Sequence, residues 1–261
     1  MCRGRPVLTR IFTIARFTLL ETIRQRVPMV LALFGVLLCL GALFLGELSV
    51  RQDEKLLTDF GLAAIDLFAN IIAVFLGTDL IAKEIQRRSL YPLLAKPLRR
   101  HELILGRYLG LVATLGWNVA LMGLGLMAIL FTTFGRADAG LSVGVFGIFL
   151  SLALLAAISV LFSSTSSPIL AMVLTLAALF VGRQSDILRN MNEAGSAVPN
   201  DVAKTLYFLL PNFRYLDFKN AVVYGDGVPT DVIVAATSYV GLYSLGLLLI
   251  AIMFFRTRDL V

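Results

Sequence analysis

The longest stretch of this chain without an ionisable side chain runs from Ala139 to Gly182, a length of 44 residues. A helix needs about 20 apolar residues to cross the roughly 30 Å hydrocarbon layer of a membrane. The stretch is therefore too long for one crossing and about right for two. Such a run of apolar surface predicts an integral membrane protein.

Composition supports the same class of protein. Hydrophobic residues make up 58% of the 261 residues and charged residues 15%, with a mean hydropathy of +0.87. A soluble domain has roughly 45–50% hydrophobic and about 25% charged residues, so the composition argues against a soluble enzyme and against a disordered chain. The single histidine, His101, has no second histidine or cysteine nearby. We therefore expect no catalytic, cofactor-binding or metal-binding residue in this chain.

Apolar runs divide the chain into six expected spans within one all-α transmembrane domain. The polar cluster from Ser163 to Pro168 predicts the turn that splits the 44-residue stretch. Before the first span, the amphipathic segment 7–26 is expected to form a helix that lies along the inner membrane surface. A long external loop, 183–231, precedes the last span. The expected spans are 27–46, 60–82, 108–133, 140–162, 168–182 and 232–255.

Lysine and arginine are distributed unevenly between the two sides that these spans define. With the amino terminus in the cytoplasm, the inner segments hold 15 basic residues and the outer segments hold 8. Cytoplasmic loops of membrane proteins carry the excess of basic residues. We therefore expect a multi-pass membrane protein with both termini in the cytoplasm. The basic charge indicates topology and not nucleic-acid binding.

The segment 83–107, between the second and third spans, is much longer than a simple connection. Its apolar residues precede Pro97, which favours a short helix at the cytoplasmic face. The segment resembles the corresponding segment in the membrane subunits of type 2 ABC exporters, including those of copper-site-assembly complexes. It departs from that family at three positions: Arg88 and Ser89 stand where the family usually has Gly and Thr, and Pro92 stands where it usually has an apolar residue. The residues in register are Glu84, Ser89-Leu90, Leu93-Leu94-Ala95, Pro97, Arg100, Glu102 and Gly106-Arg107.

This resemblance implies that 83–107 contains a coupling helix that docks on a separate cytosolic ATP-binding subunit. The chain lacks a GxxxxGK[ST] phosphate loop, so ATP and Mg would be bound by that subunit. A second permease copy or a paralogue is implied too, because a six-span chain is half of the usual unit. The alternative is that the charges only anchor the chain at lipid headgroups. The expected docking residues are Glu84, Arg87, Arg88, Ser89, Tyr91, Leu94, Pro97 and Arg100.

The second span carries three polar candidates, Asp66, Asn70 and Asp79. An ionisable group in hydrocarbon costs several kcal/mol unless it meets protein or water. Asp66 and Asn70 are four residues apart and therefore share a helix face. We expect this face to look toward a translocation path or dimer axis, or to pair with a neighbouring span. Asp79 lies near the inner end of the span, close to Lys83.

The expected external loop contains an apolar and aromatic stretch that ends at Leu216. It resembles short helices that dip into the outer leaflet in this exporter family, and Tyr and Phe suit the membrane interface. Packing against the outer ends of the spans is one expected role. Contact with substrate or with a periplasmic partner is the other. The candidate residues are Tyr207, Phe208, Pro211, Phe213 and Tyr215.

The resemblance thus implies the permease subunit of an ATP-driven exporter in the bacterial inner membrane. One alternative is a permease of the same family that transmits mechanical work to a periplasmic partner without passing a solute. Another is an ion-coupled carrier or channel that uses Asp66 and Asp79. An intramembrane enzyme is the least favoured class, because the sequence shows no paired nucleophile and base.

Overall fold

The computed structural model describes residues 7–23, 33–34, 37, 41, 53–86, 100–135, 140–184, 211–224 and 227–257. Every regular element within these ranges is a helix, which confirms the all-α fold class. In chain order the elements are α1 (Val7–Ile23), α3 (Asp53–Gln86), α5 (Arg100–Phe134), α6 (Gly140–Thr165), α7 (Pro168–Arg183), the 3-10 helix η1 (Phe213–Leu216), α10 (Lys219–Tyr224) and α11 (Thr230–Thr257).

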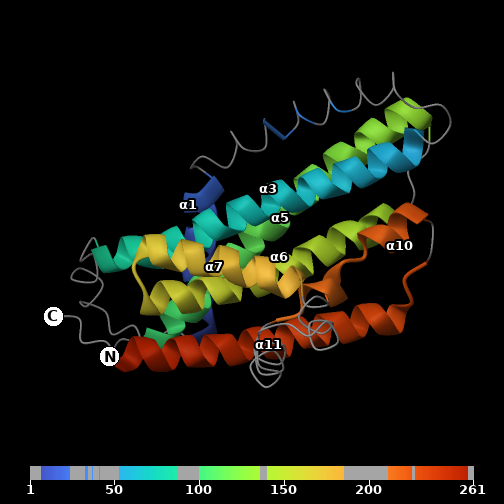
Figure 1. Ribbon diagram of the computed structural model, residues 1–261. Helices are drawn as coiled ribbons and strands as arrows, with labels where there is room; N and C mark the ends of the chain where they lie inside the picture. Colours follow the sequence, from blue (N-terminus) through green and yellow to red (C-terminus); the bar gives the residue numbers. More distant parts are fainter. Residues whose placement is uncertain are drawn as a thin grey trace, which may run out of the picture.

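The long helices lie side by side in one elongated bundle (Figure 1). Among the described residues, four helices are long and apolar enough to cross a membrane, namely α3, α5, α6 and α11. Helix α7 has only 16 residues, fewer than the roughly 20 that a full crossing needs. The expected span 27–46 lies almost entirely outside the described residues, so the count of six spans stays a prediction.

The helix ends gather at two opposite ends of the bundle. The end of α3, the start of α5, the α6–α7 turn and the end of α11 lie together (Figure 1), and we call this the inner end. The start of α3 and the start of α11 lie at the opposite, outer end. This arrangement agrees with alternating crossings. Which end faces the cytoplasm is still a prediction from the lysine and arginine count.

Helices α3 and α5 extend further than the spans expected from the sequence. Helix α3 begins at Asp53 and continues to Gln86, and α5 begins at Arg100 rather than at residue 108. Lysine, arginine, glutamate and glutamine are good helix formers, so charge marks the membrane boundary without ending the helix. The connection expected over 83–107 is therefore reduced to 87–99, which lies outside the described residues.

Helix α6 occupies the centre of the bundle. It is apolar on all sides, which is typical of a helix surrounded by other helices. It contacts α3, α5, α7 and α11. Leu152, Leu154 and Leu155 on this helix are completely buried. The bundle is thus organised around α6, and the outer helices expose apolar side chains such as Leu242 of α11.

The turn between α6 and α7 is shorter than the predicted cluster from Ser163 to Pro168. Helix α6 includes Thr165, and only Ser166 and Ser167 lie between the two helices. Near the end of α6, the hydroxyl of Thr165 donates to backbone carbonyls one turn earlier. Polar residues here fit a helix end because their hydroxyls bond locally. Pro168 then opens α7, where its missing N–H costs nothing.

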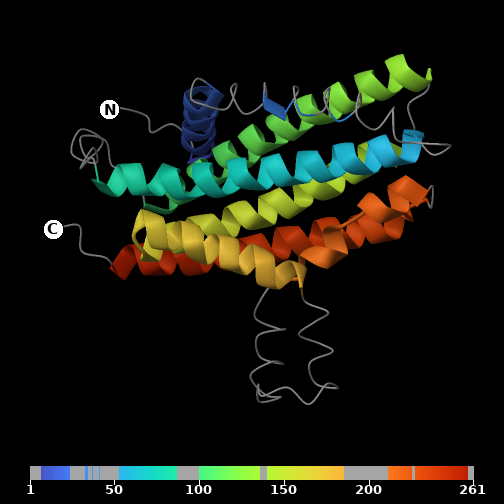
Figure 2. The same cartoon turned by 45° about the horizontal axis from the view of Figure 1, so that its top comes forward.

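Helix α1 lies steeply across the direction of the long helices in both views (Figures 1 and 2). It packs against α5, at a point where Gly110 permits close approach to Thr18 and Ala15. Arg107 forms an ion pair with Glu21 at 3.6 Å. Phe12 and Phe17 are more than 70% exposed. This placement is compatible with the expected interfacial helix, whose apolar side chains would enter the lipid surface.

Candidate functional site

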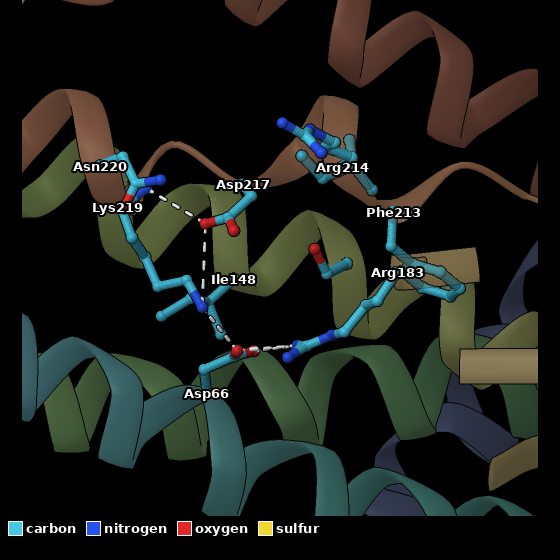
Figure 3. Close-up of a pocket in the computed structure, with 10 residues that line it drawn as sticks. Asp66, Ile148, Arg183, Phe213, Arg214, Asp217, Lys219 and Asn220 are labelled. Atoms are coloured by element: carbon cyan, nitrogen blue, oxygen red, sulfur yellow. Dashed lines mark hydrogen bonds and ion pairs between the residues drawn. The ribbon is translucent and has the colours of Figure 1, made fainter. Parts of the chain in front are cut away.

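Asp66 lies at the centre of a buried ionic cluster, although it sits in a membrane-length helix. Its side chain is 6% exposed. Arg183 donates from Nη2 to both carboxylate oxygens at 2.7 Å, and Lys219 donates from Nζ to Oδ2 at 2.7 Å (Figure 3). Burying a charge is costly unless it is paired and hydrogen-bonded. The two cations meet that condition for Asp66.

The short length of α7 explains why Arg183 reaches Asp66. A 16-residue helix rises only about 24 Å at 1.5 Å per residue, whereas the hydrocarbon layer is about 30 Å thick. Helix α7 therefore ends within the length of the bundle, beside α3 (Figure 1). Its last residue, Arg183, is placed at the level of Asp66 instead of beyond the bundle.

Residues 211–224, which we call the outer cap, bring Lys219 to the same point. Two glycines seat this segment closely on the long helices. A Cβ atom at Gly147 of α6 would lie 2.7 Å from the carbonyl oxygen of Leu216, and one at Gly182 of α7 would lie 2.5 Å from that of Pro211. The backbone N–H of Asn212 also donates to the hydroxyl of Tyr239 on α11 at 3.0 Å.

A cavity of about 390 Å³ adjoins the ionic cluster (Figure 3). Its wall combines α3, α6, the end of α7 and the outer cap, so the site is built from segments that are far apart in sequence. Three basic and two acidic side chains line it, together with polar and apolar groups. The lining residues are Asp66, Ile148, Ser151, Arg183, Phe213, Arg214, Leu216, Asp217, Lys219 and Asn220.

The three polar candidates of the second span are not brought together as one group. Asn70 donates from Nδ2 to the Oδ1 of Asp66 at 2.8 Å, as their spacing on one helix face predicts. Asp79 is exposed and lies 13 residues further along α3. Between them, the carbonyl of Thr78 accepts a hydrogen bond from Ser163 of α6 at 3.0 Å. Asp66 therefore faces a neighbouring helix and the outer cap within its own chain.

The candidates in the expected loops have different placements. Glu84 lies in the last turn of α3 and Arg100 is the first residue of α5. Of the external-loop candidates, Pro211 and Phe213 are buried and Tyr215 is 67% exposed. The candidates that lie outside the described residues are Arg87, Arg88, Ser89, Tyr91, Leu94, Pro97, Tyr207 and Phe208.

The residues that complete the ionic cluster were not among the sequence candidates. Arg183, Lys219 and Asp217 all fall in the expected external loop, as does Arg214 of the cavity lining, and nothing in the local sequence distinguishes them from other polar loop residues. One signal for Arg183 was present, because it directly follows the long uncharged run. A buried aspartate also requires a cationic partner, but the sequence does not say which one.

The membrane-length helices and the buried ionic cluster define a multi-pass helical membrane protein. A family model described as "ABC-2 family transporter protein" matches residues 12–260. The chain belongs to this family of ABC transporter permeases, which confirms the family resemblance, whereas the coupling helix expected in 83–107 stays a prediction. No curated protein matches the chain by sequence. The likeness to permeases of copper-site-assembly complexes is not shown by the family match and stays a prediction.

Family membership also sets the general role of the chain. Permeases of this family are membrane components of transporters and are generally not catalytic themselves. Membership implies association with an ATP-binding subunit.

Proposed function

We propose that this chain is the permease subunit of an ATP-driven exporter of the bacterial inner membrane. A separate cytosolic subunit binds ATP and Mg, and two permease chains, identical or paralogous, form the membrane unit. The observation that carries this proposal is the family match over residues 12–260. The basic segment between α3 and α5 supplies the contact surface for the ATP-binding subunit in this proposal.

The geometry of α3 supports this route for the motion. Helices α3 and α5 pack against each other. Helix α3 ends and α5 begins at the inner end, on either side of residues 87–99 in the sequence. Closer to the outer end of α3, Asp66 is bonded to Lys219 of the outer cap. A displacement imposed between α3 and α5 therefore has a continuous packed path to the outer cap.

The same path favours a second candidate within the family, a permease that transmits mechanical work to a periplasmic partner. The observation behind it is that the outer cap is bonded directly to α3, the helix that leads into residues 87–99. We call residues 87–99 the docking segment. The ion-coupled carrier gains less support, because both carboxylate oxygens of Asp66 already accept hydrogen bonds from Arg183 and Lys219.

Co-purification with a cytosolic ATP-binding subunit of an ABC transporter, expressed together with this chain, tests the proposal. The double variant Arg87→Glu/Arg88→Glu reverses two charges in the docking segment and should abolish recovery of that subunit, while the chain still inserts. The matched control is Arg51→Glu/Lys55→Glu, which makes the same charge change two residues before α3 in the sequence and in the first turn of α3. Equal recovery with both variants would exclude docking through this segment.

A further inference from the structure

The cavity beside Asp66 has the size and the lining of a ligand site. Its volume of about 390 Å³ falls in the range of roughly 300–1,000 Å³ that is usual for small-molecule pockets. It lies between rigid helices on one side and the outer cap on the other (Figure 3). Apolar Ile148 and Leu216 share its wall with the hydroxyl of Ser151 and the amide of Asn220.

The charge of the lining favours an anion. Arg183, Arg214 and Lys219 oppose Asp66 and Asp217, which leaves a formal net charge of +1. The three basic residues come from α7, η1 and α10. Arg183 and Lys219 point toward Asp66, whereas Arg214 is exposed and does not (Figure 3). A singly charged anion would balance the lining. A cation would add to the excess positive charge in a partly buried site.

Arg183 retains hydrogen-bonding capacity toward the cavity. Both of its hydrogen bonds to Asp66 come from Nη2, whereas a guanidinium carries five N–H donors distributed over three nitrogens. Its side chain is 41% exposed. The fork of an arginine matches the paired oxygens of a phosphate or a carboxylate. The Nε and Nη1 groups of Arg183 can therefore engage a second anion next to Asp66.

From these observations we propose that the cavity binds a phosphate diester group, with Arg183 and Lys219 as its principal cationic contacts. A phosphate diester carries one negative charge and has two unesterified oxygens for an arginine fork. Ser151 and Asn220 provide neutral hydrogen-bonding groups for the remainder of the headgroup. The source is either the headgroup of an anionic lipid or a soluble phosphate compound.

Asp66 acts in this proposal as an internal competitor for the ligand. It bonds the same two cations, at 2.7 Å each, that the phosphate would contact. Removing its charge changes the formal charge of the lining from +1 to +2. It frees donors on Arg183 and on Lys219, although Lys219 keeps its ion pair with Asp217 at 3.7 Å. The variant Asp66→Asn should therefore bind the anion more tightly than the wild type. This expectation is independent of any ATP-binding subunit.

Thermal unfolding of the purified chain in a neutral detergent tests the proposal. The fluorescence of Trp117, the single tryptophan, reports unfolding. The probes, added at constant ionic strength, are short-chain phosphatidylglycerol, short-chain phosphatidylcholine and inorganic phosphate. The variants are Asp66→Asn and, as a matched control, Asp59→Asn, which makes the same change at an exposed position of α3. Lys219→Gln and Arg183→Gln remove one cation each.

We expect phosphatidylglycerol to raise the unfolding midpoint of the wild type and of Asp59→Asn by the same amount. For Asp66→Asn, the apparent affinity should be at least about tenfold higher, which corresponds to about 1.4 kcal/mol. Phosphatidylcholine carries the same phosphate diester, but its quaternary ammonium cancels the negative charge and would lie beside a lining that already has a formal net charge of +1. Its shift should therefore be smaller than that of phosphatidylglycerol. The response should be weaker in Lys219→Gln and in Arg183→Gln than in the wild type. Each of these variants keeps Asp66 paired to the remaining cation, so they test the proposal even if Asp66→Asn does not fold.

The probes also distinguish the two sources of the ligand. A shift with inorganic phosphate as well as with phosphatidylglycerol supports a soluble phosphate compound, and a shift with phosphatidylglycerol alone supports a lipid headgroup. No shift with either probe overturns the proposal. Equal shifts with phosphatidylglycerol and phosphatidylcholine, or responses unchanged in Lys219→Gln and Arg183→Gln, overturn it too.

Discussion

At the scale of the residue, the carboxylate of Asp66 is tolerated inside the bundle because Arg183 and Lys219 neutralise it. Removing one partner of a buried ionic group leaves the other charges uncompensated, and this costs about 3–5 kcal/mol. The expected loss for Asp66→Asn is at the lower end, about 3 kcal/mol, because Arg183 is 41% exposed and water screens part of its charge. Denaturant unfolding in detergent measures this free energy.

Two comparisons separate this effect from a general sensitivity of α3. Asp59→Asn, at an exposed position, should change the free energy of unfolding by no more than about 0.5 kcal/mol. Lys219→Gln should be less harmful in the Asp66→Asn background than in the wild type, because the two residues interact directly. Strictly additive losses would show that the ion pair contributes no stability.

The sequence predicted only part of this cluster. The spacing of Asp66 and Asn70 places both on one helix face, and their hydrogen bond at 2.8 Å agrees with that prediction. The cations lie 117 and 153 residues away from Asp66 in the chain. The expected external loop holds five basic residues. Which of them meets Asp66 depends on where α7 ends and on how the outer cap folds back, and local patterns contain neither.

At the scale of the element, glycines determine how closely the outer cap approaches the bundle. A methyl group at Gly147 would meet the backbone oxygen of Leu216 at 2.7 Å, whereas one at Gly125 of α5 has nothing within 4 Å. Gly147→Ala should therefore lower the free energy of unfolding by about 1–3 kcal/mol, the usual cost of overpacking. Gly125→Ala should raise it by roughly 0.5–1 kcal/mol, since alanine favours a helix. Denaturant unfolding of both variants measures the difference, and equal effects would contradict the close seating of the cap.

The helix ends show which sequence signals were reliable. The break before Pro168 fixed the start of α7, because proline is accepted at the first position of a helix. Helix α5 begins eight residues before the expected span, because Arg100 to Arg107, which the sequence assigns to the connection, are helical. Charged side chains at the end of a span leave the hydrocarbon, but they continue the helix readily.

At the scale of the whole molecule, α3 connects the two regions that matter for the proposed function. It is 34 residues long, or about 51 Å at 1.5 Å per residue. Its inner end leads into residues 87–99, and its Asp66 is bonded to the outer cap. In the proposed function, an ATP-binding subunit that docks at the inner end displaces α3, and this displacement reaches the cap through the Asp66 ion pairs.

The central claim is that this permease responds to ATP hydrolysis in a separate subunit through the segment between α3 and α5. The most direct measurement is ATP turnover by that subunit in liposomes, with and without this chain. We predict that the chain changes the turnover rate, that Arg87→Glu/Arg88→Glu abolishes the change, and that Arg51→Glu/Lys55→Glu preserves it. The same turnover rate with and without the chain would contradict the claim.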